Sequence, residues 1–303
     1  YINHSTFHNS LVLDGIAKLY TNVTFKDDVE NYGVMQNREG YSVSSYFEGE
    51  LKNLGAITTS GGSLSIYLSK GLNNEGNYQP TNTYLRDKND RTIYTIGKSL
   101  INGNFYVNDT FTLLDENYVS HLQLNTGALL TLDTNASLVV GDYYNGNDDN
   151  RIINLNRISI KKPIDYYYDD YYRAKAYYRS ANYGGEMEVE SYGNQQHPST
   201  EDALAMWWRF KPDTADKVQV FDKLELTYEP QYLDGLSEDS IRVFFSPNAG
   251  INWEEVTEGK SIDTAKNRIT LDEARAYGHY VLSSNALGII SFEPLLQRAE
   301  PKV

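Results

Sequence analysis

The chain has 303 residues, a formal net charge of −14 and no cysteine, and 40% of its residues are hydrophobic. That hydrophobic content is enough for packed cores in a chain of this length. The acidic balance argues against a nucleic-acid partner, because a polyanion would be repelled. The absence of cysteine excludes disulfides and thiolate metal sites.

Tyrosine is the main aromatic residue, with 26 Tyr against 10 Phe, and Asn, Gly, Ser and Thr are abundant. Tyr and Thr favour strands, while Asn and Gly accept turn conformations, so many short strands joined by turns are predicted. No apolar run approaches the about 18 to 20 residues that a membrane helix needs, so no membrane-spanning segment is expected. The start at Tyr1, without an initiating Met or a signal peptide, is typical of a mature or excised segment.

An Asn-x-Gly phrase between apolar stretches recurs in the first 160 residues. Four copies are present, and each begins at an Asn and ends at a Gly: Asn31 to Gly33, Asn53 to Gly55, Asn74 to Gly76 and Asn125 to Gly127. A looser copy contains Asn102. The five asparagines are separated by 22, 21, 28 and 23 residues. This is about the length of one rung of a parallel β-helix, which contains three short strands and three turns.

Stacked rungs explain the repeat, because one rung cannot bury its own apolar side chains and a stack shares one interior. The Asn of one turn is expected to pair its amide with the Asn of the next rung. Alternating residues at 64–68 and 130–132 predict strands, and the 28-residue spacing predicts an inserted loop at about 77–89. The alternative is an antiparallel sandwich, because Asn-Gly is also a hairpin signal; the β-helix is favoured.

An oxygen-rich stretch follows at positions 142–150. Its residues Asp142, Asp148 and Asp149 are candidate ligands of a weak calcium site, since calcium takes six to eight oxygen ligands in flexible geometry. The spacing does not match the EF-hand pattern, and a solvated turn is the alternative. No other cofactor is expected.

Positions 165–179 hold a run of tyrosines among charged residues. Tyrosine provides a large contact area at low entropic cost and a hydrogen-bonding tip, and it is enriched at interfaces. The candidate interface residues are Tyr166, Tyr167, Tyr168, Tyr171, Tyr172, Tyr177 and Tyr178. The alternative is an interdomain strand whose alternate tyrosines pack on the sheets.

From about Gly184 the pattern predicts longer antiparallel strands, at 187–192, 206–210, 223–228, 241–245, 268–271 and 278–282. Their fairly even spacing predicts a sandwich of about seven strands. The predicted fold is therefore all-β, a parallel β-helix followed by an antiparallel, immunoglobulin-like β-sandwich. The predicted divisions are a β-helical domain (1–162), a Tyr-rich connector (163–183), a sandwich domain (184–288) and a linker to a further segment (289–303).

Several motifs in the second half occur in a particular order. They are Trp207-Trp208-Arg209-Phe210, Leu226-Thr227-Tyr228, Gly250-Ile251-Asn252-Trp253 and Gly278-His279-Tyr280-Val281-Leu282. Over about residues 165–285 this order resembles a sandwich module of large surface proteins of Bacteroidetes. The resemblance implies a module that follows β-helical sequence and precedes a type IX secretion sorting domain. No sorting domain is visible in these 303 residues, so the export route is implied by analogy alone.

The residues offer few signs of catalysis. The histidines (His4, His8, His121, His197 and His279) are scattered and are expected at the surface, and no nucleophile elbow, phosphate loop or zinc motif occurs. The alternative is a β-helical polysaccharide lyase or glycoside hydrolase. A hydrolase needs two carboxylates across a cleft, which 41 Asp and Glu residues supply by chance.

We therefore expect an extracellular or cell-surface protein with a structural and adhesive role and no catalytic activity. Stacked rungs would make a stiff rod, and the tyrosine-rich segment would supply a docking surface. Because the ends of a β-helix are open sheet edges, self-association into an oligomer or filament is expected. A cell-surface or glycan target is the other expected partner.

Overall fold

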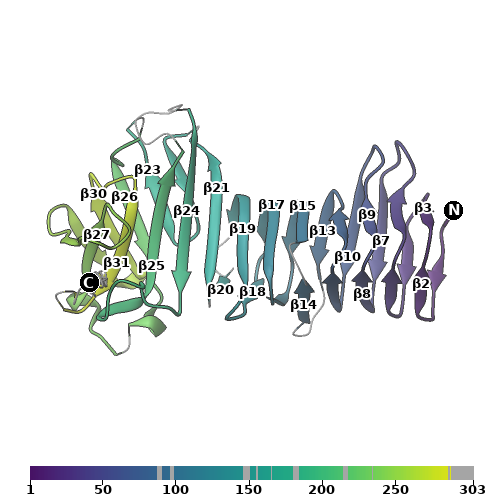
Figure 1. The fold of residues 1–303 in the computed structure, drawn as a ribbon, viewed down its shortest axis with the longest axis horizontal. Coiled ribbons are helices and arrows are strands. Elements are labelled where there is room, and N and C mark those ends of the chain that lie inside the picture. Colours follow the sequence, from purple (N-terminus) through teal and green to yellow (C-terminus); the bar gives the residue numbers. More distant parts are fainter. Residues whose placement is uncertain are drawn as a thin grey trace, which may run out of the picture.

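The computed structural model describes residues 1–86, 91–95, 99–145, 151–154, 156–164, 166–179, 184–213, 218–233, 235–285 and 287. The molecule is elongated, its strands lie across the long axis, and the N-terminus is at one end (Figure 1). Helical structure in these ranges is limited to three 3-10 turns at Pro230–Tyr232, Glu238–Ser240 and Thr264–Lys266. None of the described helices is long and apolar enough to span a membrane.

The first half is a parallel β-helix, which confirms the prediction from the Asn-x-Gly spacing. The long sheet runs through β1 (Thr6–Phe7), β4 (Val23–Phe25), β7 (Val43–Phe47), β10 (Leu64–Leu68), β13 (Asn82–Leu85), β15 (Ser99–Val107), β17 (Glu116–Leu124), β19 (Ser137–Asn145) and β21 (Arg157–Pro163). The second sheet contains β2 (Leu11–Leu13), β5 (Val29–Asn31), β8 (Glu50–Asn53), β11 (Gly71–Asn74), β14 (Arg91–Thr95), β16 (Thr110–Leu113), β18 (Leu129–Leu132) and β20 (Arg151–Asn154). A third sheet contains β3 (Ile16–Leu19), β6 (Val34–Asn37), β9 (Ala56–Thr58) and β12 (Asn77–Gln79).

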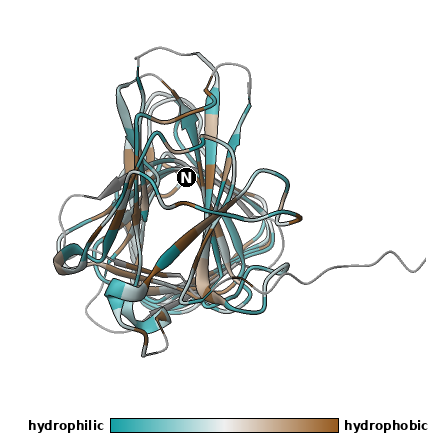
Figure 2. Cartoon of the chain, turned by 90° about the vertical axis from the view of Figure 1, so that its left-hand side faces the viewer, coloured by the Kyte–Doolittle hydropathy of each residue, from teal (hydrophilic) through white to brown (hydrophobic). Residues whose placement is uncertain are grey.

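Side chains of the β-helix alternate between the interior and the outside. In β7 and β10 every second residue is buried. Figure 2 looks along the long axis of the molecule, with the second half of the chain nearest the viewer and the rungs behind it. In-register pairing places like residues above one another. Phe7, Phe25 and Phe47, for example, stack with ring centroids 5.3 and 4.7 Å apart. The rungs therefore share one interior column, as the repeat predicts.

The first three copies of the Asn-x-Gly phrase lie at one corner of the β-helix, after β5, β8 and β11. Asn31, Asn53 and Asn74 are fully buried. The Nδ2 of Asn31 donates to the Oδ1 of Asn53 at 2.7 Å, and the Nδ2 of Asn53 donates to the Oδ1 of Asn74 at 2.6 Å. This is the amide pairing between rungs that the repeat predicts.

The glycines of these copies pack directly on one another. A Cβ at Gly55 would lie 2.1 Å from the carbonyl oxygen of Gly33, and a Cβ at Gly76 would lie 2.1 Å from that of Gly55. No side chain fits in that space, so the third position of the phrase requires glycine.

The fourth copy lies at another corner. Asn125 follows β17 and precedes β18, and its Nδ2 donates to the Oδ1 of Asn108. Gly127 has a φ of +77° and open space where a Cβ would be, so it serves a turn and not a rung contact. Among the described residues the third sheet ends at β12, so the fourth copy does not lie at the corner used by the first three.

The prediction of an inserted loop at 77–89 is wrong for positions 77–85. These residues form β12 and β13, which pair in register with β9 and β10, and positions 87–89 lie outside the described residues. Beyond β12, the strands β15, β17 and β19 of the long sheet have nine residues each, with a register shift between Ile101 and Asn104 of β15. In the described residues each rung has three strands up to β12 and two strands beyond it, and the altered spacing falls at this change.

The long sheet continues into the second half. Strand β21 pairs antiparallel with β24, and the sheet goes on through β24 (Glu186–Gly193), β25 (Ala203–Pro212), β31 (Gly278–Ser283), β27 (Arg242–Ser246) and β28 (Glu254–Glu255). A separate antiparallel sheet contains β22 (Tyr168–Asp170), β23 (Ala174–Tyr177), β26 (Lys223–Thr227), β30 (Arg268–Asp272) and β29 (Lys260–Asp263).

The two antiparallel sheets share an aromatic core. Phe221, which precedes β26, contacts Phe210 of β25 with ring centroids 5.5 Å apart and Tyr178 at 5.6 Å. The six strands predicted after Gly184 are all present. The all-β class is confirmed, while the immunoglobulin-like assignment stays a prediction.

Candidate functional site

Four tyrosines occupy equivalent positions on the outer face of the long sheet. Tyr46 of β7, Tyr67 of β10, Tyr84 of β13 and Tyr106 of β15 are paired in register. Their ring centroids are 4.6, 4.5 and 4.6 Å apart, and their planes differ by 18°, 8° and 10°. We call this set the tyrosine ladder.

Strand pairing explains the stacking. Neighbouring strands of a sheet lie about 4.8 Å apart, so identical residues in register hold their rings at stacking distance. All four rings are partly buried, and burial, with Tyr67 and Tyr106 on either side, raises the pKa of Tyr84. The Tyr84 hydroxyl therefore stays protonated at neutral pH and remains able to donate a hydrogen bond.

Polar groups flank the tyrosine ladder. Asn104 donates through Nδ2 to the Oδ1 of Asn82 at 3.0 Å, and Asn82 donates to the Oγ of Ser65 at 3.1 Å. The guanidinium of Arg86 lies over the rings of Tyr46 and Tyr67, 5.1 and 4.8 Å from their centroids. The result is a strip in which tyrosine hydroxyls repeat at the spacing of the strands, with the amides of Asn82 and Asn104 and the guanidinium of Arg86 beside them.

The tyrosine ladder is not predicted from the sequence. Its tyrosines are separated by 21, 17 and 22 residues, so no fixed period marks them, and only the register between rungs brings them together. The alternation that predicts a strand at 64–68 places Tyr67 on the outer face, and each of the other three tyrosines likewise lies between two buried residues.

The tyrosine-rich segment divides into exposed and buried residues. Tyr166, Tyr167 and Tyr168 are 69%, 65% and 54% exposed, and Tyr177 is partly buried. Tyr171, Tyr172 and Tyr178 are buried, and the hydroxyls of Tyr171 and Tyr178 lie 2.8 Å apart. The first three are placed as a docking surface requires, whereas the buried three belong to the core.

Only one of the three candidate calcium ligands, Asp142, lies in the described part of the chain. Asp142 is exposed and pairs with His121 at 3.4 Å and with Lys162 at 4.0 Å. Asp148 and Asp149 lie outside the described residues. Among the residues that the structure describes, no group of three His, Cys, Asp or Glu side chains could hold a metal ion.

The expectation that all the histidines are surface residues is wrong for His197 and His279, which are buried. The backbone N–H of Ser199 donates to Nδ1 of His197, so Nε2 of His197 carries the proton and donates to Nδ1 of His279 at 2.7 Å. Burial lowers the pKa of both to about 4, helped by His279 in the first case and by Arg209 and Lys211 in the second. Both rings are therefore neutral at pH 7.

This histidine pair lies within an aromatic cluster. The rings of Tyr192 and Trp207 stack at 3.7 Å, and Trp207 and Trp253 contact His197 edge-on at 4.5 and 5.0 Å. The Trp253 indole donates to the Ser199 hydroxyl at 3.3 Å. Hydrogen bonds and packing thus account for the arrangement without a catalytic role.

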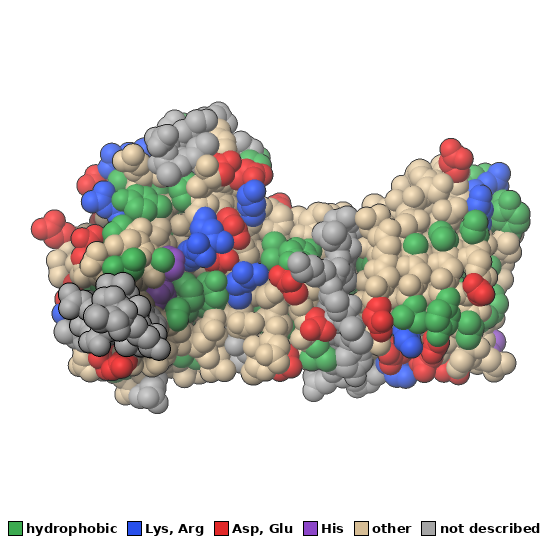
Figure 3. All heavy atoms as spheres, in the orientation of Figure 1, with side chains coloured by type: hydrophobic (Ala, Val, Ile, Leu, Met, Phe, Trp, Pro, Cys, Tyr) green, Lys and Arg blue, Asp and Glu red, His purple; other side chains and the backbone are tan. Residues whose placement is uncertain are grey.

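Ion pairs cover the long sheet where the β-helix meets the antiparallel strands. Glu190 of β24 is 2% exposed and contacts Lys211 at 2.9 Å, Arg157 at 3.3 Å and Arg209 at 3.5 Å. On the face drawn in Figure 3, Lys and Arg side chains gather with Asp and Glu over this region. Because the charges are paired, the cluster joins β21, β24 and β25 and offers little free charge.

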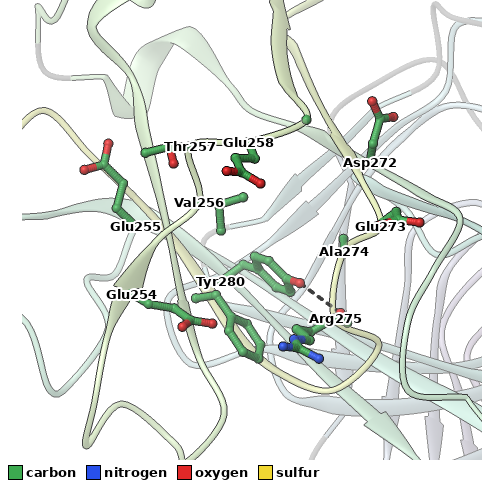
Figure 4. Close-up of a pocket in the computed structure, with 12 residues that line it drawn as sticks. Glu254, Glu255, Val256, Thr257, Glu258, Asp272, Glu273, Ala274, Arg275 and Tyr280 are labelled. Carbon is green, nitrogen blue, oxygen red and sulfur yellow. Dashed lines mark hydrogen bonds between the residues drawn. The ribbon is translucent and has the colours of Figure 1, made fainter.

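An acidic cleft of about 570 Å³ lies near β28 and the end of β30. Glu254, Glu255, Glu258, Asp272 and Glu273 line it, and their carboxylates point in different directions (Figure 4). The Tyr280 hydroxyl donates to the Arg275 carbonyl at 2.8 Å. A hydrogen bond from Arg242 lowers the pKa of Glu255, whereas a general acid requires a raised one.

Comparison of the chain with protein-family models, with curated proteins and with solved structures gives no match. The resemblance to surface proteins of Bacteroidetes therefore rests on the sequence motifs alone.

Proposed function

We propose that the protein is an extracellular structural and adhesive protein of a bacterial cell surface or appendage, which acts by binding and self-assembly and not by catalysis. The observation that carries this proposal is the tyrosine ladder on the outer face of the β-helix. The ladder offers the same groups on four consecutive strands. A polymer with regularly spaced polar groups, or the same face of a second copy, is complementary to such a strip.

Rigidity supports the proposal. The rings are held by in-register strands and by their neighbours in the stack, so little side-chain entropy remains to be lost on binding. Tyrosine is also among the residues enriched at protein interfaces. The motif order after Trp207, with the immunoglobulin-like sandwich and the type IX secretion route that it implies, adds to the proposal by analogy.

The test compares wild type with the double substitution Tyr67→Thr and Tyr84→Thr, which removes the rings and places a residue with high strand propensity at each position. We expect at least tenfold weaker self-association in sedimentation velocity, or at least tenfold weaker binding to cells or a glycan panel. Circular dichroism checks that the fold is kept. The control replaces Tyr32 and Tyr41, which are 50% and 47% exposed and lie outside the ladder, by Thr.

Two results would overturn the proposal. One is a wild-type protein that negative-stain microscopy shows only as discrete monomers and that binds neither cells nor glycans. The other is the appearance of new reducing or unsaturated ends when the protein is incubated with a polysaccharide panel, which would favour a β-helical hydrolase or lyase.

A further inference from the structure

A second cleft, of about 680 Å³, lies where the end of the β-helix meets the separate antiparallel sheet. We call it the junction cleft. The β-helix contributes Tyr143 of β19 and Ile152 of β20, while the other side contributes Tyr172 and Arg173, which precede β23, and Arg268 of β30. The volume is in the range of sites for small ligands.

Unpartnered polar atoms gather at the junction cleft. The hydroxyl of Tyr143, the Nε and Nη1 of Arg173 and the Nε of Arg268 are buried without a hydrogen-bond partner among the described residues. Buried polar groups in folded proteins are nearly always paired. Four such atoms belong to three residues that line one cleft, and a ligand with acceptor oxygens would supply the partners that they lack.

Arg173 is the central residue of this set. It is 7% exposed, and its Nη2 contacts the carboxylate of Glu229 and the Ile152 carbonyl. The Nη1 of Arg268 donates a hydrogen bond to the Oε2 of Glu225 at 2.9 Å. The existing contacts thus occupy one side of each guanidinium, and because a guanidinium only donates, the ligand has to present acceptor oxygens.

The backbone at the junction cleft is strained. Tyr172 and Arg173 have φ values of 53° and 58°, in the left-handed region that bulky residues rarely occupy. Such conformations concentrate at ligand sites, where the surrounding structure holds them. Here the Tyr172 hydroxyl donates to the carbonyl of Ile152 and accepts from its N–H at 3.2 Å, which fixes the segment against β20.

We propose that the junction cleft binds a sugar that carries a carboxylate, with the carboxylate at Arg173 and a hydrogen bond from Tyr143. A guanidinium matches the geometry and charge of a carboxylate. The tyrosine rings that line the cleft, Tyr177 and Tyr228 among them, suit the faces and hydroxyls of a sugar ring. The inference deepens the proposed adhesive function by naming a ligand class, but it is carried by the cleft and not by the tyrosine ladder.

The experiment titrates the full chain with oligosaccharides of galacturonate, glucuronate, mannuronate and N-acetylneuraminate, and with the methyl ester of each, by isothermal titration calorimetry. We expect saturable binding of at least one acidic sugar and at least tenfold weaker binding of its ester. Arg173→Lys keeps the positive charge but removes the guanidinium donors, and should weaken binding at least tenfold. The control is Arg179→Lys, because Arg179 is exposed and pairs with Glu273 outside the cleft.

Tyr143→Phe is the variant that separates binding from folding. Loss of an unpartnered hydroxyl should leave the thermal midpoint of the free protein unchanged or raised, while sugar binding weakens about tenfold. The inference is overturned if no acidic sugar binds, if esters bind as tightly as acids, or if Tyr143→Phe leaves the affinity unchanged. The Tyr67→Thr, Tyr84→Thr variant should keep full affinity for the acidic sugar. A result against the proposed role of the tyrosine ladder can therefore be distinguished from a result against sugar binding in the junction cleft.

Discussion

At the scale of single residues, buried asparagines hold the rungs in register. Asn53 accepts from Asn31 and donates to Asn74, and it also donates to the carbonyl of Asn77 at 3.1 Å. An amide buried without its partners costs about 1 to 3 kcal/mol. The hydrogen bonds between these asparagines therefore stabilise the correct stacking of the rungs and disfavour any shift of one rung against the next.

Replacement of the middle asparagine tests this role. We expect Asn53→Ala to lower the free energy of unfolding by about 2 to 4 kcal/mol, because it leaves a cavity and removes the partner of the Asn74 Oδ1. Urea unfolding followed by circular dichroism measures the change. Asn125→Ala is the matched control from the same sequence phrase, and we expect it to cost less than about 1 kcal/mol since Asn125 is not fully buried. Equal losses in the two variants would contradict this role.

The buried histidine pair predicts a pH dependence of stability. His197 and His279 have pKa values lowered from 6.5 to about 4, so the unfolded chain binds their protons more readily than the folded chain does. The contribution of the neutral histidine pair to the free energy of unfolding is complete above about pH 6.5 and is lost as the pH falls toward about pH 4.

We expect the free energy of unfolding to fall by about 3 to 4 kcal/mol between about pH 7 and about pH 5, which is about 2 kcal/mol for each histidine. Carboxylates with lowered pKa, such as Glu188 and Glu225, act below their ordinary value of 4.5 and so fall outside this window. His279→Asn should flatten the dependence, because an amide does not titrate, while His8→Asn at an exposed position should not. If the free energy of unfolding changes with pH in the same way in His279→Asn and in wild type, the histidine pair is not the source of the pH dependence.

At the scale of elements, alternation of apolar and polar residues predicted the strands well. The segment 64–68 is β10, 187–192 lies in β24 and 223–228 contains β26. The Asn-x-Gly phrase predicted the rung contacts correctly for three copies. Each contact requires an asparagine or a glycine at a fixed position of the rung, so these residues recur in the sequence.

Features that depend on register between distant residues could not be predicted in the same way. The tyrosine ladder needs the pairing of four strands at unequal spacing, and His197 meets His279 across 82 positions. The fourth Asn-x-Gly copy has the same sequence pattern as the others but lies beyond β12, the last strand of the third sheet among the described residues. The cleft lining was missed because Tyr143 and Arg173 are brought together only by the antiparallel strands that follow the β-helix.

Close contact between rungs gives a prediction at this scale. Gly55→Ala would place a Cβ 2.1 Å from the Gly33 carbonyl oxygen, so two rungs must move apart, and we expect a loss of about 2 to 3 kcal/mol. Gly127→Ala meets no atom within 4 Å and carries only the strain of a φ of +77°, about 1 kcal/mol. Thermal unfolding of the two variants measures the difference. A larger effect at Gly127 would show that turn strain, and not rung contact, limits stability.

At the scale of the whole molecule, the β-helix and the antiparallel strands share both a sheet and a core. The long sheet passes from β1 to β28 without a break, and one cluster of buried side chains extends from Leu19 to Leu282. Stacked repeats alone can unfold rung by rung, because each contacts only its neighbours. The shared sheet and core argue that the two halves of this chain unfold together.

Tryptophan fluorescence can test this, because all three tryptophans, Trp207, Trp208 and Trp253, lie in the second half. Asn53 lies in the β-helix, far along the chain from them. If the molecule unfolds as one unit, Asn53→Ala should lower the urea midpoint of tryptophan fluorescence by the same amount as the midpoint of circular dichroism. If the halves are independent, tryptophan fluorescence will keep the wild-type midpoint while circular dichroism shows an earlier, separate step, and the continuous sheet would then join two units that fold apart.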